Sequence, residues 1–169
     1  MSLEFFYFRG KKLCLYIIEM EELTHVAFAL LCFEIFEDLN PTSAIILTIF
    51  SILPDVDHSS SVFGRIFRWL SFEIEEKFGH RSITHSVLSL LLVLLLASFS
   101  KDLSIPMILG YASHLFLDML TVSGIKLLYP LNYNFVILGG PVSTGSIEDR
   151  LIGFSSFIAI VGLKFFNLL

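Results

Sequence analysis

Charged residues and cysteines are both scarce in this sequence. Only 16% of its 169 residues are Asp, Glu, Lys or Arg, whereas a typical soluble domain has about 25%. The two cysteines, Cys14 and Cys32, stand far apart with no C-x-x-C spacing, which argues against a disulfide framework and a cysteine-based zinc site. The formal net charge of −5 and the lack of a basic stripe give no indication of nucleic-acid binding.

Apolar sequence is what the chain has in excess. Hydrophobic residues make up 55% of it, and its mean hydropathy is +0.80. Apolar segments fall at residues 23–36, 42–53, 84–100, 103–120 and 151–169. The last three approach the length of about 20 residues that a transmembrane helix needs, while the first two are shorter and favour a helical hairpin. The pattern predicts an all-α, polytopic membrane bundle of about five hydrophobic helices.

The segment between the second and third apolar runs, residues 59–79, has a different pattern. Its apolar residues recur at helical spacing, and most of its charged residues lie off that stripe: Phe63, Phe67, Leu70, Ile74 and Phe78 form the stripe. Trp69 adds a side chain typical of membrane interfaces. The pattern predicts an amphipathic interfacial helix. A helix packed on the bundle through the same stripe is the alternative interpretation.

Two further features concern the ends of the domain. The stretch beginning at Met20, "MEELTHVAFALL", is typical of a natural N-terminus, so we expect residues 1–19 to be an extension and residues 20–169 to form the membrane-embedded domain. Ser146 is a predicted N-cap for the last helix, with Asp149 three residues on in capping-box register. Glu34, in the first apolar segment, has no partner that the sequence identifies.

The polar residues fall on one side of the predicted bundle. If the five segments alternate in direction, the starts of odd segments and the ends of even segments share one side. All five histidines fall there, together with four acidic residues; the set is His25, His58, His80, His85, His114, Asp55, Asp57, Asp118 and Glu148. Chance would distribute such residues over both sides.

The spacing of this set is suited to metal binding. His114 and Asp118 stand four residues apart and therefore share one helix face, and Asp55 and Asp57 share one side of an extended loop. We expect His80 to lie in a loop and His85 in the first helical turn, with Ser82 or Thr84 as the cap. Imidazole and carboxylate ligands suit zinc, with manganese or iron as alternatives, and about four ligands per zinc allow one to three ions.

Simpler interpretations exist for several of these residues. Asp55 and Asp57 are also suited to capping a turn after Pro54, Glu148 to a favourable interaction with a helix dipole, and His25 to a position beside a cap. The pair of His114 and Asp118 is harder to explain in that way, because ionisable groups inside an apolar segment are costly and are usually functional.

Basic residues predict which side of the membrane carries this set. Nine of the eleven Lys and Arg residues fall on the histidine side: Arg9, Lys11, Lys12, Arg65, Arg68, Lys77, Arg81, Lys126 and Arg150. Only Lys101 and Lys164 fall on the other side. Because cytoplasmic loops are enriched in basic residues, the sequence predicts an inner-membrane protein whose metal site faces the cytoplasm.

The motifs "LTH", "LPDVDH", "HRSITHS", "YASHLFLDML" followed by "GIKLLYP", and "STGSIED" occur in this order between about residues 20 and 155. Together they resemble the YdjM-like family of membrane-bound metal-dependent hydrolases. The resemblance implies that His25, Asp55, His80, His85, His114 and Asp118 bind metal, with Asp57, His58 and Glu148 as further candidates. The spacing of His114 and Asp118 is also similar, more distantly, to that in zinc-dependent phospholipases C.

Hydrolysis at the membrane surface is therefore the function that the sequence favours. A divalent metal ion activates water for attack on an ester, and Asp55 or Asp118 is expected to orient the reactants or act as a base. Arg81 is the candidate for binding a phosphate group, because its planar fork matches phosphate oxygens. The expected substrate is a phosphoester or a lipid-linked phosphate, with membrane lipid as the partner. Metal transport, metal sensing and a structural metal site are the alternatives.

Overall fold

The five apolar segments fold as helices in the computed structural model, which describes residues 6–8, 11–13, 20–36 and 40–167. These helices are α1 (Met20–Phe36), α2 (Pro41–Ile52), α5 (Val87–Ala97), α6 (Lys101–Met119) and α7 (Ile147–Asn167). Shorter elements join them: η1 (Leu53–Asp57), α3 (Val62–Ile66), α4 (Arg68–Phe78) and η2 (Ile83–His85), of which η1 and η2 are 3₁₀ turns. Two short antiparallel strands, β1 (Phe6–Phe8) and β2 (Lys11–Leu13), precede α1. From α1 onward the described elements are all helices, as the sequence predicts.

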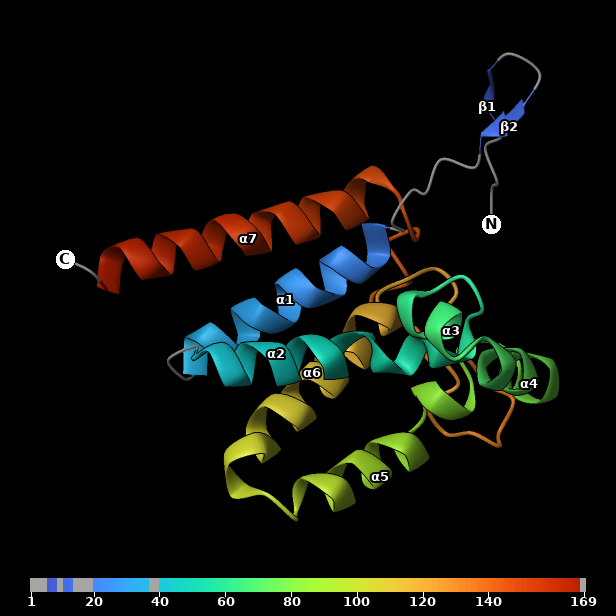
Figure 1. Ribbon diagram of the computed structural model, residues 1–169, viewed down its shortest axis with the longest axis horizontal. Coiled ribbons are helices and arrows are strands. Elements are labelled where there is room, and N and C mark those ends of the chain that lie inside the picture. The colour runs from blue at the N-terminus through green and yellow to red at the C-terminus, as the bar shows by residue number, and fades with distance from the viewer. Residues whose placement is uncertain (1–5, 9–10, 14–19, 37–39, 168–169) are drawn as a thin grey trace.

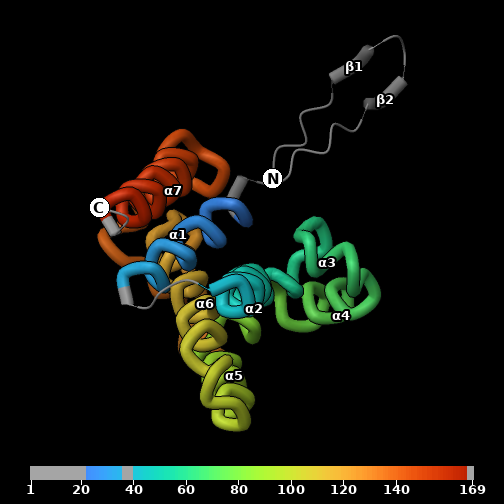
Figure 2. Tube along the Cα trace, turned by 60° about the vertical axis from the view of Figure 1, so that its left-hand side comes forward, coloured from blue at the N-terminus to red at the C-terminus, as the bar shows by residue number. Residues whose placement is uncertain are grey.

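Helix α6 is the centre of the bundle. It packs against α1, α2 and α5, and α7 lies along the other side of α1 (Figure 1). Turning the molecule shows α3 and α4 beside the end of α2, away from α1 and α7 (Figure 2). One apolar cluster joins α5 and α6 through Val93, Tyr111 and Leu115, and a second joins α1 and α2 through Phe33 and Leu47. The ends of α2 and α6 therefore meet the turn before α5.

A glycine allows α6 to approach α2 closely. A Cβ atom at Gly110 would lie 2.6 Å from the carbonyl oxygen of Leu47 and 3.2 Å from the nitrogen of Ser51, which is closer than packed atoms tolerate. One turn further along both helices, Nδ1 of His114 donates a hydrogen bond to the carbonyl oxygen of Ser51 at 2.6 Å. The missing side chain thus brings the backbone of α2 within reach of a histidine of α6.

Helix starts agree with the sequence in part. Asn40 caps α2 by accepting a hydrogen bond from the Ser43 nitrogen at 2.9 Å, and Pro41 follows it. Before α5, however, the cap is Ser86 rather than the expected Ser82 or Thr84, and His85 lies in the 3₁₀ turn that precedes the helix. Ser89 completes the capping box with Ser86. His85 is therefore not part of α5, and contacts outside that helix hold its side chain.

Ser146 caps the last helix, because its hydroxyl accepts a hydrogen bond from the Asp149 nitrogen at 3.4 Å. The return bond differs from the expected capping box. The Asp149 carboxylate accepts from the Gly145 nitrogen at 2.9 Å instead of from Ser146. This contact ties the loop before α7 to the first turn of the helix.

The expected amphipathic helix of residues 59–79 is broken in two. Phe67 has a non-helical backbone between α3 and α4. Gly64 lets α3 pack closely on the preceding turn, because a Cβ at this position would collide with the carbonyl oxygen of His58. Helix α3 is therefore held against that turn, while α4 takes its own direction. Apolar side chains remain exposed on both pieces, among them Ile66, Phe67, Trp69 and Phe72.

Glu34 does have a partner in the structure. Lys164 of α7 places its Nζ 2.8 Å from Oε1 of Glu34, and the Glu34 side chain is 1% exposed against 46% for Lys164. Because a buried carboxylate requires compensation, this ion pair fixes how α1 and α7 align. The sequence did not indicate it, since 130 positions separate the two residues.

Across the residues that the structure describes, no helix combines enough length and apolar character to cross a membrane. The polytopic arrangement that the sequence favours thus stays a prediction at this point. Most of the expected N-terminal extension, residues 1–19, lies outside the described residues, and the division after residue 19 also stays a prediction.

Trp69 allows a direct test of whether α4 contacts lipid, because it is the only tryptophan of the chain and is 77% exposed. We expect lipids brominated near the headgroup to quench its fluorescence more strongly than lipids brominated near the chain ends, since interfacial tryptophans lie at headgroup depth. The measurement uses the full chain reconstituted in vesicles. Quenching by aqueous acrylamide but by neither lipid would show that α4 faces water.

Candidate metal centre

Four parts of the chain supply the polar cluster at one end of the bundle. The turn η1 supplies Asp55 and Asp57, and the segment from residue 80 to 85 supplies two histidines and an arginine. The last turns of α6 supply His114 and Asp118, and the second turn of α1 supplies His25. Most of these side chains are buried. The elements meet as the alternating arrangement of segments predicts.

All five imidazole rings lie in one continuous row. Successive ring centroids are 3.9 Å apart for His25 and His114, 5.1 Å for His114 and His85, 5.7 Å for His85 and His80, and 4.6 Å for His80 and His58. The expected convergence of the histidines is therefore confirmed.

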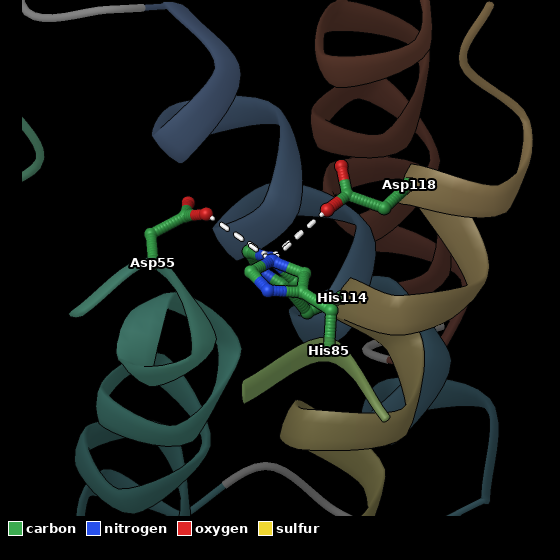
Figure 3. A group of neighbouring side chains, drawn as sticks. All are labelled: Asp55, His85, His114 and Asp118. Carbon is green, nitrogen blue, oxygen red and sulfur yellow. Dashed lines mark hydrogen bonds and ion pairs between the residues drawn. The ribbon is translucent and has the colours of Figure 1, made fainter. Parts of the chain in front are cut away.

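The centre of the row is a set of four donors, which we call the four-donor set: Asp55, His85, His114 and Asp118. Figure 3 shows the two carboxylates approaching the imidazoles from different elements. Nε2 of His85 and Nε2 of His114 are 3.2 Å apart. Oδ1 of Asp55 lies 3.4 Å from the first nitrogen and 3.5 Å from the second, and Oδ2 of Asp118 lies 3.1 Å and 3.5 Å from them.

These separations fit a tetrahedral metal ion. Bonds of about 2.0 to 2.2 Å would space tetrahedral ligands by about 3.3 to 3.6 Å. Five of the six separations in the set range from 3.1 to 3.5 Å, and the sixth, between the two carboxylates, is within 4.8 Å. Oδ2 of Asp118 is buried and, among the described residues, makes no hydrogen bond. A buried carboxylate oxygen without a hydrogen bond is costly, and coordination of a cation would remove that cost.

Hydrogen bonds on the far side of both rings direct their lone pairs into the set. Nδ1 of His114 must carry a proton, because its partner is the Ser51 carbonyl oxygen, which only accepts. The Thr84 hydroxyl donates to Oδ2 of Asp57 at 2.5 Å and therefore accepts from Nδ1 of His85 at 2.9 Å. When the rings are neutral, Nε2 is therefore the basic atom of each, and the two basic atoms face each other, which is the tautomer that a metal-binding histidine needs.

Asp57 supports the set from behind without entering it. Its two oxygens contact four groups: Nδ1 of His80 at 2.8 Å, the Arg81 backbone nitrogen at 3.0 Å, the Thr84 hydroxyl and, at 3.3 Å, Nδ1 of His85. A carboxylate behind a metal-binding histidine orients the ring and raises its basicity. A second group that could hold a metal, Asp55, Asp57 and His80, shares Asp55 with the four-donor set.

The charges of the cluster stabilise one another. Burial raises the pKa of Asp55, but the charge of His114 and hydrogen bonds from His114 and His85 outweigh it and hold that pKa well below its ordinary value. The pKa of Asp57 is lowered in the same way, mainly by His85 against the effect of burial. The low pKa values of Asp55 and Asp57 favour their ionised forms, which need positive charge beside them.

The remaining predicted residues lie outside the four-donor set. His25 stacks on His114 and has Nε2 3.7 Å from Oδ1 of Asp118. His58 contacts the Ser60 hydroxyl at 3.1 Å and lies 4.0 Å from Glu75. His80 is partly exposed. Glu148 is exposed on α7, and the structure buries its neighbour Asp149 instead.

Arg81 lies beside the set and faces a pocket. Its Nη2 is 2.7 Å from Oδ1 of Asp118, and its Nη1 donates to the Thr121 hydroxyl at 2.8 Å. The pocket is lined by residues that include His25, Arg81, Asp118 and Asp149. No polar motif contains Thr121 or Ser51, so sequence reasoning misses both. Asp149 belongs to the "STGSIED" motif, but its capping position already explains it in the sequence.

Comparison with known proteins gives a family for the chain. The family described as YdjM inner membrane protein matches residues 20–165. The uncharacterized protein YvsG of Bacillus subtilis (strain 168) is 40% identical over 105 residues, which cover 60% of this chain and 65% of that protein. The inner membrane protein YdjM of Escherichia coli (strain K12) is 36% identical over 117 residues, which cover 63% of this chain and 59% of that protein. The matches thus span less than two thirds of either relative, and no solved structure matches the chain significantly.

We expect the purified protein to hold at least about one equivalent of divalent metal and the variant His114→Ala/Asp118→Ala to lose it, because the variant removes two of four donors. Plasma mass spectrometry of the detergent-purified full chain measures this. Asp102→Ala, at the opposite end of α6, is the matched control and should keep the metal. Metal retained in the double variant, or absent from the wild type after loading with zinc and manganese, would contradict the site.

We also expect Asp57→Asn to weaken metal binding by about tenfold to a hundredfold, the usual effect of losing a carboxylate behind a ligating histidine. Competition with a fluorescent zinc chelator measures the affinity. Asp102→Asn is the control for the loss of one carboxylate charge. An affinity equal to that of the wild type would mean that Asp57 does not orient His85.

Proposed function

This chain belongs to the YdjM family of inner membrane proteins, and from that premise we propose that it is a membrane-held, metal-dependent hydrolase of phosphoesters. The buried His/Asp cluster can hold a metal ion, which is the part of the proposal closest to the observed geometry. Hydrolysis and the phosphoester substrate go beyond it.

One observation carries the hydrolase proposal: Asp118 joins the four-donor set to the pocket. Its Oδ2 faces the imidazoles of His85 and His114, while its Oδ1 accepts a hydrogen bond from Arg81 in the pocket wall. A metal that served only to tie helices together would need no polar pocket beside it. A cationic fork next to a metal cluster is suited to positioning a phosphoester for hydrolysis.

The residues divide the work as follows. His85, His114, Asp55 and Asp118 would hold the ion, and Asp57 would keep His85 in the required tautomer. A divalent ion supplies a Lewis acid that activates water and polarises a phosphoryl oxygen. Arg81 would bind and orient the phosphate group. Asp55 turns Oδ1 toward the two histidines, and its other oxygen would hydrogen-bond an attacking water. Asp118 is the second candidate for that role.

The apolar surface supports a location in the inner membrane. Helix α7 exposes a series of large apolar side chains, and α5 does the same: Phe154, Phe157, Ile158, Val161 and Phe165 on α7, and Leu88, Leu91, Leu92 and Leu95 on α5. Such faces are unfavourable in water and suit a lipid environment. We propose a polytopic arrangement whose polar cluster lies toward the cytoplasm, where most basic residues of the sequence are expected.

A structural metal site is the second candidate, and a specific observation favours it. Four protein donors already complete a tetrahedral set, and structural zinc sites are closed in this way, whereas catalytic sites keep a position open. A metal in that role would fix η1, the turn before α5 and the end of α6 against one another without chemistry.

A hydrolysis assay separates the two candidates. The metal-loaded full chain in detergent is tested on p-nitrophenyl phosphate, bis-p-nitrophenyl phosphate and a phosphatidic acid. We expect release of product from at least one of them, and a loss of about a hundredfold or more in kcat/KM for Asp118→Asn, because charge stabilisation in such a site is worth several kcal/mol. Asp102→Asn should equal the wild type. Full metal content with no hydrolysis would favour the structural site.

A further inference from the structure

The pocket beside the four-donor set has polar and apolar walls. Its enclosed volume is about 20 Å³, and the rest of the site is open to solvent. Its polar wall includes Arg81, His25, Thr144 and Asp149, and its apolar wall includes Leu117 and Ile152. The residues come from α1, α6, α7 and the loops before α5 and α7. A pocket of this kind fits a small polar group that has an apolar attachment.

Arg81 is held firmly in the wall of the pocket. Its φ of 58° lies in the left-handed region, which non-glycine residues rarely adopt. The backbone is kept there from both sides, because its N–H donates to Asp57 and its carbonyl oxygen accepts from the Lys126 nitrogen at 3.0 Å. Strained backbone of this kind occurs where a side chain must be placed for function.

Two buried nitrogen atoms of the pocket residues have no hydrogen-bond partner within the described part of the chain. They are Nε of Arg81 and Nδ1 of His25. The His25 side chain is 8% exposed, so solvent does not readily satisfy it. Arg81 also reaches toward the Thr144 hydroxyl at 3.4 Å, a long contact. Nε of Arg81 is a donor in every protonation state, and an unpaired buried donor is costly. An oxyanion in the pocket would pair it.

Asp149 restricts which oxyanion fits. It is buried in the pocket wall, and its hydrogen bond from Gly145 engages only one of its two carboxylate oxygens. A carboxylate repels a fully deprotonated anion but accepts a hydrogen bond from an anion that keeps a P–OH group. Inorganic phosphate and the monoanion of a phosphomonoester keep such a hydrogen near neutral pH, whereas sulfate and phosphodiesters do not.

We propose that this pocket binds a terminal phosphate group, with Arg81 as its cation and Asp149 as the residue that excludes phosphodiesters and sulfate. This assignment rests on the proposed function, since it identifies the substrate as a phosphomonoester. The apolar wall lies on the ester side of the phosphate. A lipid phosphate and a water-soluble monoester share this chemistry.

Binding of small anions tests the subsite without any turnover. Isothermal titration calorimetry on the full chain in detergent compares inorganic phosphate with sulfate, and methyl phosphate with dimethyl phosphate. We expect phosphate and methyl phosphate to bind about tenfold or more tightly than their counterparts, the difference that one charge-assisted hydrogen bond makes. Equal binding of the two members of each pair, or no binding of phosphate, would overturn the proposal.

Variants identify the residues. Arg81→Gln should weaken phosphate binding about tenfold or more, and Asp149→Asn should bring sulfate within about threefold of phosphate by removing the repulsion. Arg150→Gln, an exposed residue next to Asp149, is the charge-matched control and should bind phosphate like the wild type. Because Arg81→Gln leaves Asp118 with less compensation and is at risk of misfolding, Thr144→Val serves as a second variant, with an expected loss of about threefold. Unchanged binding in Arg81→Gln or in Thr144→Val would also overturn the proposal.

The same samples separate this proposal from the proposed function. Metal content and phosphate binding are measured together, before and after chelation. Phosphate binding that depends on Arg81 in a protein without metal or hydrolysis would keep the subsite and refute the hydrolase. Hydrolysis with an unchanged KM in Thr144→Val and Asp149→Asn would keep the hydrolase and refute the subsite. Tighter binding of dihexanoyl phosphatidic acid than of glycerol 3-phosphate would show that the ligand's phosphate group belongs to a lipid. Equal binding would show that it belongs to a soluble ester.

Discussion

The burial of three carboxylates at one end of an apolar bundle is the constraint on which the rest of the structure depends. Asp55, Asp57 and Asp118 are all withdrawn from water, and an uncompensated buried charge costs several kcal/mol. Arg81 compensates part of this charge by pairing with Asp118. The imidazoles of His85 and His114 face the remaining oxygens at 3.1 to 3.5 Å. Whatever electropositive group lies between the two facing Nε2 atoms, a proton or a metal ion, holds three chain segments together: η1, the turn before α5 and the end of α6.

Small residues make this convergence possible. Gly110 lets α2 and α6 approach, so that the Ser51 carbonyl reaches His114. Tyr111, the next residue, donates its hydroxyl to the Thr84 carbonyl oxygen at 2.5 Å and holds the turn that carries His85. Packing residues of α6, such as Gly110 and Tyr111, therefore position the groups that hold His114 and His85. A change in the packing would alter the geometry of the polar cluster.

Much of the helical architecture could be predicted from the sequence, since apolar runs and breakers such as Pro54 give the positions of the five long helices to within a few residues. The convergence of the histidines also followed, because it needs only the direction of each segment. Contacts that depend on tertiary packing could not be predicted. Lys164 meets Glu34 only because α7 lies along α1, and the helix break at Phe67 accompanies a close approach of Gly64 to the His58 backbone.

The site shows the same division. Sequence spacing placed His114 and Asp118 on one helix face, and the structure brings them together with Asp55 and His85. The spacing could not show that Asp57 lies outside the four-donor set. Asp57 is only two residues from Asp55, but it faces Nδ1 of His85 rather than Nε2. Nor could the spacing decide between Glu148 and Asp149, because adjacent residues on a helix differ in direction by about 100° and only the position of α7 decides which of them is buried.

Asp118 is the point at which the proposed metal site and the proposed phosphate subsite influence each other. One of its oxygens belongs to the four-donor set and the other pairs with Arg81. A divalent cation among the donors would draw the charge of Asp118 toward itself, which would leave more of the Arg81 charge for an anion in the pocket. An anion at Arg81 would in turn favour the cation, because coupling between two sites is reciprocal. This sharing explains how a pocket whose wall holds two carboxylates can still accept a phosphate group: the local charge balance includes the metal ion, and the two ligands belong to one electrostatic unit.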